Sequence, residues 1–502
     1  MPHVPVHVRA LALFMTHQTA MILGTVMGLT VAFPTITEEF NTTIATTVWI
    51  QLGYSLALAG GTFSLGLSST LLDKRKLVIF GLLADVVLMA IIFNTHNIYV
   101  FIGARFLSAF VRIYPWLILQ VMGIGGFPAH QRGKVLGIVA ITQGVGMLVS
   151  IPLAGFVTEV FGWRWLFMGT SVFYLMLAPV VWVLIPAQPR SADAPKIRLS
   201  QFDIPGSVFM MMGMVSILAS VQIFVRGYSS TIGPVLAVAA VVSVGAFIWV
   251  ELRTKTPVVD FALFKMRGVT MGALQAISFG WGNGSLQLLL PFLFIVGYGW
   301  SITYTAGIML FMNIVRPVSG FLSGWLSDRI GSSKVIVAAA VVALTGQLIL
   351  ASFNVEPELV IVIVALMLMG TGQAFMQTAN QRQIFTSIPK EQLHAAPSTS
   401  LVLTTSGSAT GQAFVGAALG ASTAIAASGG DGNLALVSAA STSIYIMSAV
   451  FVVGLTAAQL LPRLLARKQG PVEAGTATEA EAEGRTCADG DRMRDASEGA
   501  RT

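Results

Sequence analysis

The segment "GFLSGWLSDRIGSSK", Gly320–Lys334, places an acid, an arginine and a lysine between two long apolar stretches. A second segment, "GLSSTLLDKRK", Gly66–Lys76, shares a glycine and the basic run, and it also lies between apolar stretches. A charged turn that occurs twice in an apolar chain indicates an internal repeat, because two units that fold alike need the same connection. The sequence therefore predicts a duplicated architecture.

The composition is that of a membrane protein. The chain has 502 residues, of which 55% are hydrophobic and 10% are charged, whereas a soluble domain carries about 25% charged residues. The apolar residues form repeated blocks of roughly 18 to 27, each long enough to cross a hydrocarbon core about 30 Å thick. A transmembrane β-barrel would show alternating segments of about ten residues instead. We expect an all-α polytopic membrane protein.

Fourteen apolar blocks are long enough to be membrane spans. We expect them near Ala10–Ala32, Thr46–Leu67, Leu77–Thr95, Tyr99–Gly123, Val135–Val157, Leu166–Ile185, Pro205–Val225, Thr231–Val250, Val269–Val296, Thr303–Leu322, Val335–Phe353, Leu359–Thr378, Ser398–Leu419 and Val437–Leu460.

The blocks divide the chain into five parts. We expect an N-terminal six-helix bundle at 10–186, a cytoplasmic loop at 187–203, two inserted helices at 204–251 and a C-terminal six-helix bundle at 252–462. Residues 463–502 are rich in Ala, Gly, Glu and Arg, a composition typical of a disordered cytoplasmic tail.

Lysine and arginine in the loops predict the orientation, because cytoplasmic loops carry an excess of both. With the N-terminus inside, the inward loops hold sixteen of these residues, and the outward loops hold only Arg164 and Arg226. Both termini are then cytoplasmic. The first block is full length and lacks the cleavage site of a signal peptide. We expect a multi-pass protein of the plasma membrane, which in a bacterium is the inner (cytoplasmic) membrane.

Several classes of function are disfavoured. The net charge of +7 is scattered over short loops, so nucleic-acid binding is not indicated. The single cysteine, Cys487, lies in the polar tail, which excludes disulfides and thiolate metal sites. The sequence shows no nucleophile–base pair, metal-ligand cluster or phosphate loop, so we expect neither an enzyme nor a bound cofactor or metal.

The second charged turn reads Gly324-x-x-x-Asp328-Arg329-x-Gly331-x-x-Lys334 and resembles the signature loop of the major facilitator superfamily. Asp328 is suited to cap a helix end and to pair with a basic residue of a neighbouring helix. Gly324 would allow close helix packing, and Gly331 would allow a tight turn.

The first charged turn departs from that pattern. It keeps Gly66 and the basic residues Lys74 and Arg75, but it has Thr70 where the acid is expected and Asp73 where the turn glycine is expected. We hypothesise that the N-terminal half latches through Asp73 or depends on the second copy.

Two further motifs carry the resemblance. "FIGARFLSAFVR" is similar to the fourth-helix motif of the family, which places its arginine at Arg105. "GVGMLVSIPLAG" resembles the fifth-helix antiporter motif, with Ile151–Pro152 in place of Gly-Pro. The glycines and proline of this motif are Gly144, Gly146, Pro152 and Gly155.

Three more stretches resemble the fourteen-helix drug:proton antiporter branch, namely "VAFPTI" from Val31, "GWRWLF" from Gly162 and "VGYGWSITYTAGIMLF" from Val296. The resemblance covers roughly residues 10 to 460. It implies the major facilitator fold, with two six-helix bundles plus two extra central helices and fourteen transmembrane helices in all. It also implies multidrug-type efflux from the cell by proton exchange, with Arg105 coupling proton state to gating.

Ionisable residues inside a span cost a few kcal/mol on insertion scales and are functional candidates. Those inside the expected spans are Asp85, Arg105, Arg112, Arg316 and His17. Asp85 is the deep acid able to carry a proton, and we assign proton coupling or gating to Asp85, Arg105 and His17. The alternatives are a structural ion pair for Asp85 and an interfacial position for His17.

Arg105 and Arg112 are seven residues apart and therefore share one helix face, which Trp116 continues. One interpretation places this face on a central cavity, where Arg112 would attract an anionic group. The alternative is that Arg112 pairs with Asp85 in the adjacent hairpin.

The sign of the embedded charge bears on the cargo. The drug:proton branch has an aspartate in its first helix roughly where Thr25 stands here, and Ser398–Gly416 contains no acid. The embedded charge sums to about +2, which repels lipophilic cations and favours neutral or anionic cargo.

The cavity is expected to be lined by polar residues as well. Its candidates are Arg112, Trp116, Gln143, Trp281, Asn283, Gln287, Asn313, Arg316 and Gln377. The glycine-rich ninth span, "FGWGNGSLQLLLPF", suggests a flexible helix near a site, and the alternative is ordinary packing of helices through small residues.

The leading hypothesis is a secondary active exporter of a small amphipathic, neutral or anionic organic compound, driven by the proton gradient through alternating access. The expected partners are a small-molecule substrate, protons and the lipid bilayer, and the expected state is a monomer. An uptake symporter or uniporter of an organic anion is the alternative. A non-transporting membrane sensor or scaffold is the alternative from another class.

Overall fold

The computed structural model describes residues 4–22, 28–66, 73–186, 232–251, 266–352, 357–387, 396–427 and 432–468, together with single positions between 209 and 253. In these residues all regular structure is helical. The expected loop at 187–203 and the tail from residue 469 lie outside them. So does the expected seventh span, Pro205–Val225, apart from single positions.

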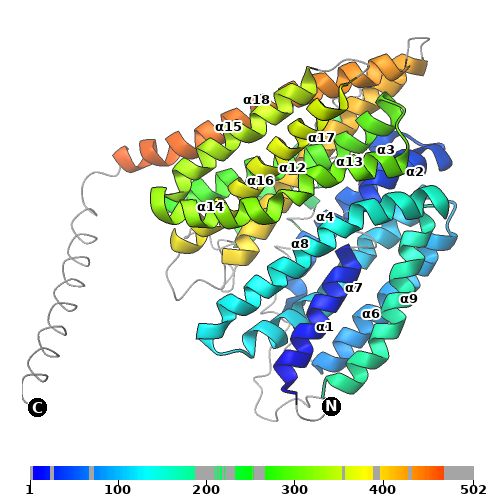
Figure 1. Cartoon of the computed structure of the whole chain (residues 1–502), viewed down its shortest axis with the longest axis vertical. Helices are drawn as coiled ribbons and strands as arrows, with labels where there is room; N and C mark the ends of the chain where they lie inside the picture. Colours follow the sequence, from blue (N-terminus) through cyan, green and yellow to red (C-terminus); the bar gives the residue numbers. More distant parts are fainter. Residues whose placement is uncertain are drawn as a thin grey trace, which may run out of the picture.

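The described helices between residues 6 and 184 form the N-terminal bundle (Figure 1). They are α1 (Val6–Met21), the 3-10 turn η2 (Gly28–Ala32), α2 (Phe33–Glu39), α3 (Ile44–Thr47), α4 (Trp49–Gly66), α6 (Lys74–Asn94), α7 (Ile98–Gly125), α8 (Ala129–Val160) and α9 (Arg164–Leu184). The expected first span, Ala10–Ala32, is therefore neither one helix nor complete, because helical structure continues to Glu39.

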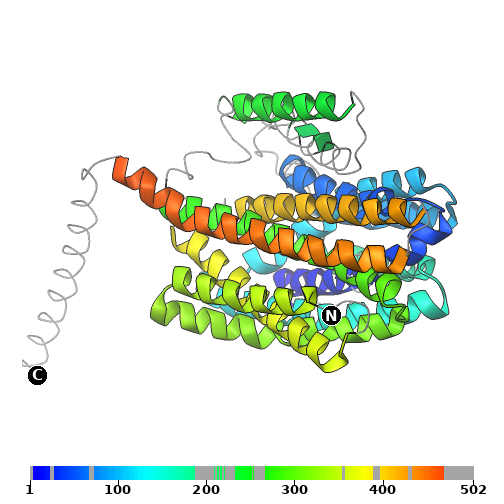
Figure 2. The ribbon, with the colours of Figure 1, turned by 90° about the horizontal axis from the view of Figure 1, so that it is seen from above.

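The C-terminal bundle is built from the helices after residue 266 (Figure 1). They are α12 (Arg267–Phe292) with its π-helical turn η5 (Leu293–Gly297), α13 (Ile302–Ile314), α14 (Arg316–Ile330), α15 (Ser332–Ala351), α16 (Leu359–Ser387), α17 (Ala396–Ala427) and α18 (Gly432–Lys468). Helix α18 continues past the expected end of the bundle at residue 462. Helix α11 (Ile232–Glu251) lies to one side of both bundles (Figure 2).

Eight of the described helices are long and apolar enough to cross a membrane. Three shorter apolar helices, Ile44–Leu58, Gly144–Val160 and Pro234–Val250, fall on the expected second, fifth and eighth spans. The order of these helices along the chain follows the expected order of spans.

Local sequence explains where several helices begin and break. Asp73 begins α6, and its carboxylate accepts a hydrogen bond from the Arg75 backbone N–H at 3.0 Å. Asn97 begins α7 in the same way, because its side chain accepts from the Tyr99 N–H. The tenth span breaks at Val315, between α13 and α14, because Pro317 lacks an N–H and its ring disfavours a continuous helix.

The two bundles share one hydrophobic core at the end that carries the connections near residues 40, 96, 162 and 300, which we name the closed end. Residues of both bundles belong to it, among them Leu29, Val48 and Trp163 from the first bundle and Leu289 and Ile308 from the second.

At the opposite end, which we name the open end, each bundle has a core of its own. Phe14, Leu82 and Leu119 belong to a core confined to the N-terminal bundle. Phe279 and Met376 belong to a core confined to the C-terminal bundle. The described part of the chain is therefore two bundles joined at the closed end.

Candidate functional site

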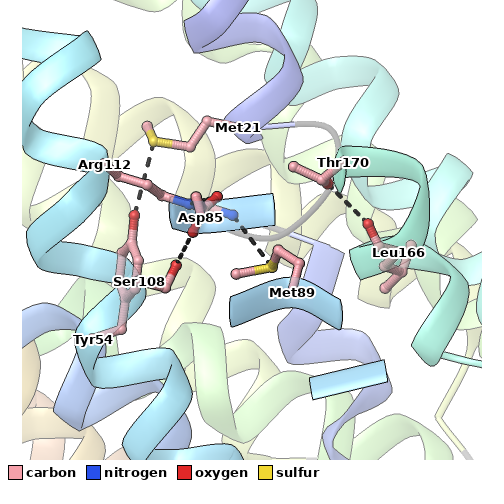
Figure 3. Close-up of polar contacts among 8 residues, drawn as sticks. All are labelled: Met21, Tyr54, Asp85, Met89, Ser108, Arg112, Leu166 and Thr170. Carbon is pink, nitrogen blue, oxygen red and sulfur yellow. Dashed lines mark hydrogen bonds and ion pairs between the residues drawn. The ribbon is translucent and has the colours of Figure 1, made fainter. Parts of the chain in front are cut away.

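A buried ion pair lies between α6 and α7 in the N-terminal bundle (Figure 3). Asp85 Oδ2 accepts a hydrogen bond from Arg112 Nε at 2.8 Å, and Asp85 Oδ1 accepts from Ser108 Oγ at 2.6 Å. Arg112 Nη2 also lies 3.6 Å from the sulfur of Met89. Asp85 and Arg112 are 0% and 1% exposed. Of the two interpretations of Arg112, the geometry is that of the pair with Asp85.

Arg105 lies on the same face of α7, one and two turns from Ser108 and Arg112. It is fully buried, and its guanidinium carbon lies 4.1 Å from the centre of the Tyr54 ring. The Tyr54 hydroxyl is 3.8 Å from the sulfur of Met21 (Figure 3). Arg105 therefore connects α7 to α4, the helix that packs against α17 of the other bundle.

His17 is fully buried on α1 and stacks on the Tyr174 ring of α9, with ring centres 5.1 Å apart. Neither of its ring nitrogens has a hydrogen-bond partner among the described residues. The Arg112 guanidinium lies 5.7 Å from the same Tyr174 ring. The interfacial alternative for His17 is therefore wrong, because burial places it beside the ion pair.

This cluster of Asp85, Arg105, Arg112, His17 and Tyr174 is the buried charge cluster of the N-terminal bundle. It contains two cations and one carboxylate, so a positive charge remains after the pair is counted. Removing one partner of a buried pair costs about 3–5 kcal/mol. Loss of either Asp85 or Arg112 would therefore destabilise the N-terminal bundle.

The sequence hypotheses missed Ser108, Tyr54 and Tyr174. Ser108 was detectable, because it lies three residues after Arg105 on the face already assigned to function. Tyr54 and Tyr174 were not, because their helices meet α7 only in the tertiary structure. Trp116, expected on a cavity, is partly buried against the core of the N-terminal bundle.

Arg316 is the charged residue at the middle of the C-terminal bundle, at the first position of α14. It keeps part of its surface accessible although protein surrounds it. The ion pairs among the described residues do not include it. The next residue, Pro317, faces Gly144 of α8 across the interface between the bundles. A Cβ added to Gly144 would lie 3.7 Å from the Cγ atom of Pro317. Arg316 is thus adjacent to the interface.

The other expected cavity residues occupy different environments. Trp281 is partly buried and tilted against Phe414 of α17, at 5.6 Å between ring centres. Asn313 is buried, and its amide donates to Met309 O at 3.1 Å. Gln377 is exposed. Asn283 and Gln287 are partly buried on α12, and the side chain of Gln143 lies outside the described residues.

Glycines make α12 a packing helix. A Cβ on Gly280 or Gly284 would clash with the backbone carbonyls of α17, and a Cβ on Gly407 or Gly411 would clash with those of α12. The ninth span is therefore rich in glycine because two helices approach backbone to backbone. The expectation of a flexible helix there was wrong, since α12 is continuous to Phe292.

Buried amides on α12, α16 and α17 were missed from the sequence. Gln275 is fully buried, and neither of its amide atoms has a hydrogen-bond partner among the described residues. The amide oxygens of Asn380, Gln383 and Gln412 are also buried without such a partner. Helices α12, α16 and α17 thus bury polar groups that carry no charge.

The second signature loop makes the expected ion pair. Asp328 Oδ1 lies 2.5 Å from Arg382 Nη2 of α16, and Arg382 also donates to Ser327 O. Gly331 has a φ of +88°, as a tight turn after a helix requires. The close approach expected at Gly324 was wrong, because a Cβ there would come no nearer than 4.0 Å to Thr378.

The basic residues of both loops lie at the surface. Arg329 lies over the ring of Trp325 at 3.9 Å, and Lys334 is exposed. In the first loop, Arg75 lies over the Trp182 ring at 4.0 Å, while Lys74 is partly exposed. Gly66 ends α4, and Asp73 caps its own helix.

At the closed end, the "GWRWLF" turn joins three connections of the N-terminal bundle. Trp163 Nε1 donates to Glu39 Oε2 at 2.5 Å, and Arg164 forms an ion pair with Glu39. Arg164 also donates to Thr95 O at 3.0 Å. The positive φ of Gly162, +92°, allows this turn.

The fifth-helix motif lies on the interface between the bundles. A Cβ on Gly155 would clash with Ala306 of α13, and Pro152 lies inside α8. Gly146 faces Ile22 instead, at 3.6 Å. One turn beyond Gly155, Glu159 Oε2 accepts a hydrogen bond from the Thr303 N–H at 2.7 Å. This bond joins α8 to the first turn of α13.

Comparison with known proteins agrees with this two-bundle geometry. A family profile described as Major Facilitator Superfamily matches residues 15–424. The chain belongs to the Major Facilitator Superfamily. It is therefore a multi-pass membrane protein of a transporter family, as the signature loops predicted.

Among its relatives, the multidrug transporter protein MdtP of Bacillus subtilis is 23% identical over 407 residues, which are 79% of this chain and 72% of MdtP. The riboflavin transporter RibZ of Clostridioides difficile is 22% identical over 371 residues, 72% of this chain and 78% of RibZ. A crystal structure of a bacterial homologue of the human lysosomal transporter Spinster, in an inward-facing and occupied conformation, superposes with a TM-score of 0.63 at 14% identity. It covers 92% of this chain and 96% of that one.

Proposed function

We propose that this protein exports a small amphipathic organic compound, neutral or anionic, in exchange for protons and by alternating access. The observation that carries the proposal is the sign of the charge in the two bundles. Among the described residues inside the two bundles, the cations Arg105, Arg112 and Arg316 outnumber the carboxylate Asp85, which pairs with Arg112. A positive interior repels lipophilic cations and attracts anions.

Similarity to a multidrug transporter supports efflux. The loop charges favour cytoplasmic termini. With that orientation the closed end would face outward, and this conformation would be open to the cytoplasm. In that state Arg316 would meet cargo arriving from inside the cell. Asp85 would carry the proton, since it is the carboxylate of the buried charge cluster.

The similarity to a protein named as a riboflavin transporter favours a second candidate, a carrier for one organic metabolite without proton antiport. The two candidates differ in coupling. A carrier of that kind moves its cargo down a cargo gradient with no imposed pH gradient and no proton release.

The test uses purified full-length protein in proteoliposomes that contain a trapped pH indicator. Anionic, neutral and cationic lipophiles of matched size are added in turn under an imposed proton gradient. We expect anionic or neutral compounds to trigger proton flux. Flux triggered by cations alone would contradict the charge argument.

Two variants separate cargo binding from proton coupling. Arg316→Gln is expected to abolish flux with anions but to keep flux with neutral compounds, and Arg316→Lys is expected to keep both. Asp85→Asn is expected to abolish proton flux with every compound. Ser108→Ala, which removes one hydrogen bond to Asp85 but keeps its charge, is the matched control.

A further inference from the structure

A groove lies in the N-terminal bundle between α1, α8 and α9. Its volume is about 620 Å³, within the range of about 300–1,000 Å³ that small-molecule sites occupy. None of the residues assigned above to cargo, protons or gating lines it. The groove is therefore separate from the buried charge cluster.

The lining of the groove has no charge and no unused hydroxyl donor. Thr16 and Thr19 on α1 donate to Ala12 O and Met15 O, at 2.7 and 2.8 Å. Thr142 on α8 and Thr170 on α9 donate to carbonyls one turn earlier in their own helices. The rest of the lining is apolar apart from the indole N–H of Trp165, so an occupant gains packing contacts and almost no hydrogen bonds.

The groove opens toward the outside of the bundle. Leu153 on α8, and Trp165 and Phe173 on α9, line it and are 42%, 50% and 37% exposed. On a membrane protein, exposed apolar side chains of spanning helices contact the hydrocarbon of the bilayer. The groove is thus continuous with the lipid phase.

Such a space is not expected to hold water, because apolar cavities without free polar partners stay dry. Left empty, its walls would lose their dispersion contacts. A cargo site would in addition need a few convergent polar groups to orient its ligand, and these walls offer none. We propose that one acyl chain of a bilayer phospholipid occupies the groove between α1, α8 and α9.

The acyl chain would occupy a gap inside the N-terminal bundle. Helix α8 makes its most extensive contact with α13 of the other bundle, and smaller contacts with α1 and α9 of its own. The acyl chain lies between α8 and those two helices, where it fills the gap that these smaller contacts leave.

The matched variants fill the groove or leave it open. Ala12 and Gly169 both line it and are exposed, and a Cβ on Gly169 meets nothing within 4 Å. The double variant Ala12→Phe with Gly169→Phe fills the groove. The control is Ala90→Phe with Gly103→Phe, on exposed positions of α6 and α7 outside the groove.

The first measurement is photo-crosslinking of the full chain, reconstituted with a phospholipid that carries a diazirine in its acyl chain. We expect adducts on the groove-lining peptides of α1, α8 and α9 in the wild type and the control. We expect loss of these adducts in the filled variant. Equal labelling of the filled variant would overturn the proposal. So would a wild type whose groove shows no lipid adduct but binds an uncharged lipophilic dye.

The second measurement does not depend on transport. Delipidation in detergent is expected to lower the Tm of the wild type and of the control, and added phospholipid is expected to restore it. The filled variant should show no such response, because its two rings replace the chain. A lipid response of the filled variant equal to that of the wild type would refute the site.

Discussion

The two bundles differ in the side chains that they bury. The N-terminal bundle buries a charged cluster, in which Asp85, Arg105 and Arg112 lie within one helix hairpin and its neighbours. The C-terminal bundle buries uncharged amides and packs α12 on α17 through glycines at Gly280, Gly284, Gly407 and Gly411. The first bundle can change its charge state, whereas the second is held by backbone contacts that tolerate no added atom.

The difference suggests a division of labour. A buried ion pair is sensitive to the loss of one partner, so the stability of the N-terminal bundle depends on Asp85 and Arg112 together. Close backbone packing transmits displacement as a rigid body, so the C-terminal bundle is suited to move as one unit. Four experiments test this contrast.

The largest effect is expected in the charged bundle. Asp85→Asn leaves Arg112 buried without its counter-charge, so the free energy of unfolding should fall by about 3–5 kcal/mol. Replacing both residues, Asp85→Leu with Arg112→Met, should restore most of it. Unfolding in detergent, followed by circular dichroism, measures both. If the double variant also exchanges protons, the ion pair has no coupling role.

The next effect is expected at the glycine contacts. Gly284→Ala places a methyl group against Ser408 O of α17, and overpacking of this kind costs about 1–3 kcal/mol. Gly307→Ala on α13 is the control, because a Cβ there meets nothing within 4 Å. The Tm of each variant in detergent distinguishes them. A Gly284→Ala protein as stable as the control would show that α12 and α17 separate easily.

A smaller effect is expected where the bundles meet. Glu159→Ala removes the hydrogen bond that the Thr303 N–H donates to an exposed carboxylate, worth about 1 kcal/mol because solvent competes for it, and should increase the population with the closed end open by about fivefold. Spin labels at the exposed positions His96 and Glu358 would report it as a longer distance. The control is Glu38→Ala, which removes an exposed acid nearby and should leave the distance between the two labels unchanged. A longer distance in this variant too would attribute the effect to net charge.

The smallest effect is expected at the second signature loop. Arg382 and Asp328 are 34% and 67% exposed, and exposed pairs contribute about 0–1 kcal/mol. Asp328→Asn should therefore change the free energy of unfolding by less than about 1 kcal/mol. A larger loss, measured by denaturant unfolding, would mean that the loop stabilises the bundle beyond its ion pair.

Much of the architecture could be predicted from the sequence. The signature turn at Gly324–Lys334 indicated one transporter family, which the family match confirmed. Together with its imperfect copy it also predicted two related bundles. Helix boundaries were less predictable, because the 3-10 turn at Gly28–Ala32 and the continuation of α16 to Ser387 differ from the spans that the apolar blocks indicated. Gly324 shows the limit of a motif, since the glycine is present although no helix approaches it closely.

The candidate site was predictable by residue type but not by pairing. Asp85, Arg105 and Arg112 are unusual because charges are costly within a membrane span, and sequence alone identifies such residues. The sequence left open whether Arg112 faced a cavity or Asp85. The amides Gln275 and Asn380 escaped notice because an uncharged polar residue in a span is too common to be informative.

The sequence by itself determined that the chain is helical and spans a membrane, because hydrophobic length is a local property. It also predicted a repeated unit from the recurrence of a charged turn. Only the tertiary structure decided that Asp85 meets Arg112, that Tyr54 and Tyr174 meet the arginines, and that glycines lock α12 to α17. Those contacts join residues far apart in the chain. Which helix faces meet depends on how the helices rotate and cross, and that is set by the packing of all of them together.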